Sequence, residues 1–106
     1  MTRRFHISVS VTDYDGSVRD YTERLGSVPV TSVKNRYALW RTDLLNFSIS
    51  CKPGQSAGIV RHIGFEDSAE QTFREEQDIN GITWEYFNEA AQQSEIDKLV
   101  AEFKPA

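Results

Sequence analysis

The sequence predicts a single α+β domain, spanning residues 1–106, in which helices pack outside a mixed, curved β-sheet. Residues 4–11 alternate between apolar and polar side chains, which is the period of a half-buried strand. Residues 18–25 then carry apolar or aromatic side chains at helical spacing. A segment similar to the first strand returns at residues 60–65, which indicates two related halves and a pseudo-twofold arrangement. A chain of 106 residues buries one modest core, so a second domain is not expected.

The first strand divides its side chains between two faces. The apolar face holds Phe5, Ile7, Val9 and Val11, and the polar face holds His6, Ser8 and Ser10. The helix that follows, at about residues 17–25, places Val18, Tyr21 and Leu25 on one stripe. Its N-cap is one of three residues: Asp13, Asp15 or Ser17. Gly26 is suited to the position just after its last turn.

Three further strands are expected before a linker. They cover residues 28–33, 37–41 and 44–51, with turns at 34–36 and 42–43 between them. Residues 52–58 are rich in proline, glycine and serine and form the clearest linker of the chain. Residues 4–52 therefore predict a βαβββ-type module.

The second module, at residues 58–87, is shortened, because it is too brief for a helix and three further strands. Strands are expected at 58–65 and 82–87. Residues 68–77 suit either a short helix or, from residue 72, a strand that leads into a hairpin turn at 78–81. The acidic residues from Glu66 to Asp78 suit a solvated face.

A C-terminal helix is expected at residues 94–103. Ser94 and Asp97 stand at the spacing of a capping box. Its apolar stripe consists of Ile96, Leu99, Val100 and Phe103.

Charge and cysteine content exclude some classes of partner. The net charge is −4 and the isoelectric point is about 5.1, which argues against a nucleic-acid partner. The single cysteine, Cys51, permits no intrachain disulfide and fits a cytoplasmic location. We expect neither a signal peptide nor a membrane-spanning segment, and therefore no membrane partner.

Three motifs resemble the vicinal-oxygen-chelate superfamily, which contains glyoxalase, bleomycin-resistance and extradiol dioxygenase proteins. Residues 5–26 resemble its opening strand and helix, with His6 near the start of the strand. Residues 61–65, which include His62, are similar to the opening of its second module. Residues 78–87 resemble its closing motif, an Asp-x-x-Gly turn followed by a strand that carries Glu85. The likeness spans most of residues 4–87.

The resemblance implies a metal site, because family ligands come from the first and last strands of each module. His6, His62 and Glu85 stand at three of these places and suit iron(II), nickel, manganese or zinc. Ser48 falls at the fourth, where the family has Glu, and serine is a poor ligand for these metals. This departure argues against glyoxalase I activity. The candidate substrate-binding residues are Ser48, Tyr37, Trp40 and Trp84. The alternative for the aromatic ones is the core or a dimer interface.

Three functions remain open, and whether the protein is an enzyme stays undecided among them. The first is a metal-dependent lyase, isomerase or dioxygenase of unknown substrate. The second is a metal-free binding or sequestration module for a small molecule, in which a homodimer completes the half-open sheet. The third is a non-catalytic interaction domain, whose helix at 94–103 packs over the sheet or on a neighbour.

Overall fold

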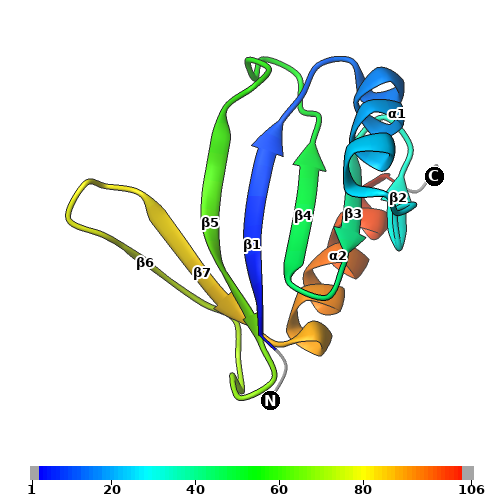
Figure 1. Cartoon of the computed structure of the whole chain (residues 1–106). Helices are drawn as coiled ribbons and strands as arrows, with labels where there is room; N and C mark the ends of the chain where they lie inside the picture. The colour runs from blue at the N-terminus through cyan, green and yellow to red at the C-terminus, as the bar shows by residue number, and fades with distance from the viewer. Residues whose placement is uncertain (1–2, 104–106) are drawn as a thin grey trace.

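Residues 3–103 are described by the computed structural model of the chain (Figure 1). The sequence places Phe103 on the apolar stripe of the last helix, but its side chain lies outside the part of the chain that the structure describes. The elements are β1 (Arg3–Ser10), α1 (Tyr14–Leu25), β2 (Thr31–Val33), β3 (Tyr37–Arg41), β4 (Leu45–Ser50), β5 (Val60–Asp67), β6 (Arg74–Gln77), β7 (Thr83–Phe87) and α2 (Glu89–Phe103). Mixed strand pairing and the terminal helix confirm the predicted α+β class.

The seven strands form one open sheet in the order β2-β3-β4-β1-β5-β7-β6. β1 pairs in parallel with β4 on one side and antiparallel with β5 on the other. β5 in turn pairs in parallel with β7, which repeats the relation of β1 to β4. The hairpin of β6 and β7 projects from the body of the molecule (Figure 1).

The antiparallel pairing of β1 with β5 is locally symmetric. Three residue pairs define it: Ile7 with Ile63, His6 with Gly64, and Ser8 with His62. A local twofold axis through the first pair exchanges His6 with His62. The same axis exchanges Ser8 with Gly64.

The parallel neighbours of these strands follow the same symmetry. Ser8 pairs with Ser48 on β4, and Gly64 pairs with Glu85 on β7. Ser48 and Glu85 are therefore counterparts in the two halves. The alignment of Ser48 with a fourth family ligand stays a prediction.

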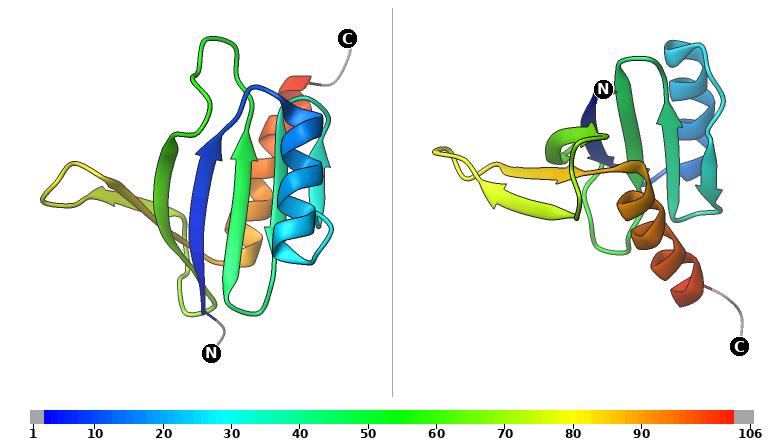
Figure 2. Two further views of the ribbon diagram at one scale, coloured as in Figure 1. Left: turned by 45° about the horizontal axis from the view of Figure 1, so that its top comes forward. Right: turned by 90° about the horizontal axis from the view of Figure 1, so that it is seen from below.

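The two helices lie on opposite faces of the sheet (Figure 2). The apolar side chains of β3 and β4 pack against α1. The buried members of this core are Val11, Tyr14, Ala38, Trp40 and Ile49. α2 lies over the polar face, and His6, Ser8 and Ser10 are each only 2% exposed there. The face that the alternation marks as polar is thus buried.

Helix α1 begins earlier than the pattern of apolar residues predicts. Its N-cap is Asp13, whose Oδ1 accepts a hydrogen bond from the Gly16 amide at 3.0 Å. Asp13 is one of the three predicted N-caps, so that candidate is confirmed, and the helix begins three residues before the predicted start at about residue 17. Gly26 does end the helix, in the left-handed conformation with φ of 66°.

The ambiguous segment at 68–77 contains the strand β6, which pairs antiparallel with β7, so the helical alternative is wrong. Asp78 shapes the turn between them, since its Oδ1 accepts from the amides of Asn80 at 2.8 Å and Ile82 at 3.0 Å. The predicted start of the last helix at Ser94 is also wrong. α2 begins at Glu89, and Asn88 Oδ1 before it accepts from the Ala91 amide at 2.7 Å.

None of the helices between residues 3 and 103 combines the length and the apolar character needed to span a lipid bilayer.

Candidate metal centre

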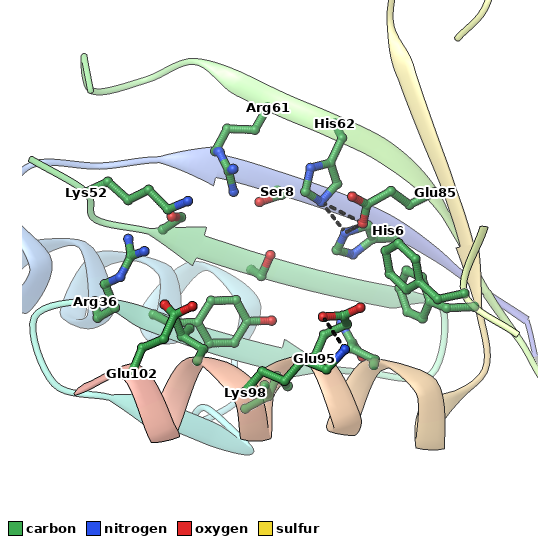
Figure 3. Close-up of a pocket in the computed structure, with 18 residues that line it drawn as sticks. His6, Ser8, Arg36, Lys52, Arg61, His62, Glu85, Glu95, Lys98 and Glu102 are labelled. Carbon is green, nitrogen blue, oxygen red and sulfur yellow. Dashed lines mark hydrogen bonds and ion pairs between the residues drawn. The ribbon is translucent and has the colours of Figure 1, made fainter. Parts of the chain in front are cut away.

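His6, His62 and Glu85 converge from β1, β5 and β7 on the polar face of the sheet (Figure 3). His6 Nε2 lies 2.9 Å from His62 Nε2 and 3.7 Å from Glu85 Oε1. His62 Nε2 lies 3.0 Å from the same carboxylate oxygen. The structure thus brings together the three residues that the sequence proposes as ligands.

The neighbour of the other His6 ring nitrogen fixes its tautomer. His6 Nδ1 lies 2.8 Å from Asn46 Oδ1 and 3.1 Å from the Asn46 backbone oxygen. Both oxygens only accept, so Nδ1 carries the hydrogen and Nε2 presents a lone pair to the cluster. Burial lowers the pKa of His6 and His62 lowers it further, while the hydrogen bond to Asn46 acts in the opposite direction. A neutral imidazole held in this way is typical of a metal ligand.

The cluster holds fewer hydrogens than contacts. Neutral His6 has none on Nε2, and a carboxylate oxygen of Glu85 has none either. His62 Nε2 supplies one at most, and a single N–H does not serve two acceptors with good geometry. A cation shared by the three lone pairs would satisfy all of them.

The separations within the cluster suit such an ion. Two donor atoms at right angles around one ion lie about 3.0 Å apart when each bond is about 2.1 Å. The His6–His62 distance of 2.9 Å and the His62–Glu85 distance of 3.0 Å match this value. The 3.7 Å between His6 and Glu85 corresponds to a wider angle. Two histidines and one carboxylate on one side of an ion leave positions open for a ligand.

A buried amide pair supports His6 from behind. Asn46 Nδ2 donates to Gln92 Oε1 at 2.8 Å, and Gln92 Nε2 donates back to Asn46 Oδ1 at 3.1 Å. Asn46 Nδ2 also donates to Glu66 Oε1 at 2.8 Å. These bonds hold Asn46 so that its oxygens face the imidazole, and they link α2 to the site.

Glu66 anchors this network and corrects the prediction of a solvated acidic run. The residue is only 4% exposed. Arg4 Nη1 and Arg41 Nε each bind one of its oxygens at 2.7 Å. Burial alone would raise the pKa of Glu66, but hydrogen bonds from Arg41 and Asn46 outweigh it and hold the pKa below its ordinary value.

A cavity of about 450 Å³ adjoins the three candidate ligands, between the polar face of the sheet and α2. This volume fits a small molecule. Tyr37 and Ser48 line it, and their hydroxyl groups are hydrogen-bonded. Burial raises the pKa of Tyr37 to about 12, although the bond to Ser48 opposes the shift. Phe87 closes the metal end, with its ring 5.0 Å from that of His6.

The two tryptophans proposed as substrate contacts lie outside the described lining of this cavity. Trp40 is fully buried in the core beneath α1, and its Nε1 donates to Thr22 Oγ1 at 3.2 Å. Trp84 stacks on Phe65 on the opposite face of β7. Trp40 is three residues from Tyr37 on one strand, so the two side chains point to opposite faces.

Sequence reasoning missed the residues that support and extend the centre. Asn46 had a signal, because it is two residues before Ser48 and therefore shares its face. Gln92 had none, since its role depends on how α2 packs. The same holds for Arg61, whose side chain also lines the cavity.

No protein-family model matches the chain, and no curated protein matches its sequence. Membership of the vicinal-oxygen-chelate superfamily therefore stays a prediction.

Proposed function

We propose that this protein binds a divalent transition-metal ion through His6, His62 and Glu85 and presents it to a small molecule in the adjoining cavity. The observation that carries this proposal is the convergence of three donor atoms that share at most one hydrogen. Iron(II), manganese, nickel and zinc suit this donor set. A bound ion would act as a Lewis acid toward two adjacent oxygens of the ligand. The proposal places the protein with the superfamily that its sequence resembles.

The chain's own residues supply orientation and exclusion of water. Asn46 fixes the His6 ring with its lone pair toward the cluster. Phe87, itself stacked on Phe73 at 5.6 Å, covers the metal end with apolar surface. Ser48 stands where a fourth carboxylate would neutralise the ion, so more positions stay open for the ligand. This arrangement favours lyase, isomerase or dioxygenase chemistry of the three-ligand type.

The test is a metal titration of untagged, metal-stripped protein with manganese, nickel, zinc and, without oxygen, iron(II). The wild type is expected to bind one ion. Asn46→Ala should weaken binding roughly 10- to 100-fold, because it loses the partner that orients His6. His62→Ala and Glu85→Gln remove a ligand and should weaken it more.

Ser48→Ala is the matched control, since it alters the counterpart position without removing a ligand, and its affinity should stay within about twofold of the wild type. Circular dichroism verifies that each variant is folded. If the folded wild type bound none of the four ions stoichiometrically, the metal proposal would be wrong.

The second candidate is a metal-free binding module, and one observation favours it. Ser48 leaves the cavity without the fourth carboxylate that the sequence resemblance leads us to expect. In that case His62 would donate its one hydrogen to His6, which lies 2.9 Å away. The same titration separates the two candidates, because only the first predicts a stoichiometric ion.

A further inference from the structure

The end of the cavity away from the candidate metal ligands is basic. Arg36 lies just before β3, Lys52 just after β4, and Arg61 in β5. Figure 3 shows the three side chains directed toward one another across this end, where Glu102 of α2 also lies, with His6 and Glu85 at the other end. Three segments far apart in the sequence thus bring their positive charges to one place.

Arg61 reaches the cavity because of a β-bulge. Simple alternation would send its side chain to the face opposite that of its neighbour His62. The pairing of β1 with β5 shifts at this point, since Ser8 lies opposite His62 and Val9 lies opposite Val60. Arg61 is the extra residue, and a bulge redirects such a side chain. Both Arg61 and His62 therefore line the cavity.

The three cations repel one another at this end of the cavity. Desolvation lowers the pKa of Lys52, and Arg61 and Arg36 lower it further, while Glu102 on α2 acts in the opposite direction. Within residues 3–103, neither Lys52 nor Arg61 makes a direct ion pair. Arg36 is held by its own hydrogen bond to the Cys51 carbonyl at 3.4 Å. An anion between the three would relieve this repulsion.

The spacing of the two ends sets the size of a ligand that spans them. Ser10 pairs with Ser50, two residues before Lys52. Ser10 is four residues beyond His6 on β1, about 13 Å away at about 3.3 Å per residue. The long basic side chains cover part of this distance. A ligand of roughly 10 Å therefore fits between the basic end and the metal end.

We propose that the cavity takes a small anionic ligand whose carboxylate or phosphate group is bound by Arg36, Lys52 and Arg61. This inference rests on the proposed function, in that the opposite end of the ligand reaches His6, His62 and Glu85. Guanidinium groups bind the oxygens of such anions in pairs, and the ammonium of Lys52 adds a point charge. The ligand class is thus an organic acid or a phosphate ester with oxygens at its far end.

The test titrates metal-free protein with inorganic phosphate and, separately, with succinate at low ionic strength, followed by amide NMR shifts. Saturable shifts at Arg36, Lys52 and Arg61 are expected for at least one probe. The probe that binds more tightly distinguishes a phosphate from a carboxylate site. Arg61→Gln and Lys52→Gln should each weaken it roughly tenfold, as expected for loss of a hydrogen bond to an anion.

Two surface variants are the matched controls. Arg24→Gln and Lys34→Gln remove the same charges from side chains that are 71% and 73% exposed and lie outside the cavity lining. Their affinities should stay within twofold of the wild type. Absence of saturable binding for both probes, or equal weakening by the control variants, would overturn the proposal.

A further variant separates this inference from the metal proposal. Asn46→Ala should weaken metal binding roughly 10- to 100-fold and keep anion binding within twofold, because Asn46 orients His6 from behind and lies outside the cavity lining. Anion binding without metal binding would support the basic site alone. Metal binding without anion binding would overturn the basic site and leave the metal proposal standing.

Discussion

The two halves of the sheet have equivalent strand pairing, but among the residues that the structure describes only the first half has a helix packed on its apolar face. In the first half, α1 lies over the apolar face, and Trp40 on β3 is fully buried beneath it. The second half has no helix over the same face among residues 3–103. In the first half, Trp40 on β3 pairs with Phe47 on β4. In the second half, Trp84 stands at the position of Phe47, and the residue that pairs with it is the exposed Glu76 on β6. One half therefore has a closed core where the other has an open face.

Two arginines partly replace the absent helix. The guanidinium of Arg3 lies 3.7 Å from the ring centre of Phe65, and that of Arg74 lies 4.1 Å from the ring centre of Tyr86. Such contacts keep aromatic rings half-buried while the charge stays in water. The difference between the halves separates two tasks, since the first half supplies most of the core and the second supplies two of the three candidate ligands.

The largest expected effect contrasts the two tryptophans. Trp40→Ala should reduce the free energy of unfolding by roughly 3–5 kcal/mol, because it leaves a cavity in the closed core. Trp84→Ala should cost about 1–2 kcal/mol, since Trp84 is half-buried and loses mainly its bond to Asp78 at 2.8 Å. Urea denaturation measures both. Equal losses would show that the second half is as closed as the first.

The next effect sharpens the symmetry of the strands. A Cβ at Gly64 would stand 1.8 Å from the Glu85 backbone oxygen, so β5 and β7 would have to separate. Gly64→Ala should cost roughly 1–3 kcal/mol and displace Glu85 from the histidines. Its counterpart Ser8 already carries a side chain, and Ser8→Ala should cost about 1 kcal/mol or less. Urea denaturation and metal titration of both variants test this. Equal losses of stability and equal metal affinities for Gly64→Ala and Ser8→Ala would contradict it.

The smallest expected effect concerns the ion pairs of Glu66, which link the two halves of the sheet. Glu66 on β5 binds Arg4 on β1 and Arg41 on β3. Its lowered pKa means that its stabilisation is present above the ordinary glutamate pKa of about 4.3 and is lost as the pH falls through the lower folded value. Glu66→Gln should therefore destabilise by roughly 1–2 kcal/mol at pH 7 and less near pH 3.

Unfolding by urea between pH 7 and pH 3 tests this difference. The exposed Glu75→Gln on β6 is the control and should change stability by less than about 0.5 kcal/mol at any pH. If Glu66→Gln lowered the free energy of unfolding equally at pH 7 and pH 3, stabilisation by the charge of Glu66 would be contradicted.

Local patterns predicted much of the fold and the three candidate ligands. Alternation located β1, and the repeat of its sequence near His62 predicted that the two histidines belong to equivalent strands. The Asp78–Gly81 turn placed Glu85 on the last strand. The alternation of side chains along β3 also indicates that Tyr37 and Trp40 lie on opposite faces, because they are three residues apart.

Long-range pairing decided the rest. Residues 74–77 are all exposed, and only their hydrogen bonds to β7 make them a strand. Glu66 resembles its acidic neighbours in sequence, and it is buried because partners up to 62 residues away surround it. The direction of Arg61 depends on a shift in pairing that no local pattern of the strand reveals.

The bulge at Arg61 also relates chain length to fold. The pair Ser8–His62 lies on one side of the bulge and the pair Val9–Val60 on the other. A chain lacking Arg61 would therefore join them in one regular antiparallel ladder. Loss of a residue between His62 and Glu66 would instead turn one of these two side chains to the opposite face. Deletion of Arg61 would thus remove one positive charge from the basic end of the cavity while the pairing of β1 with β5 stays intact.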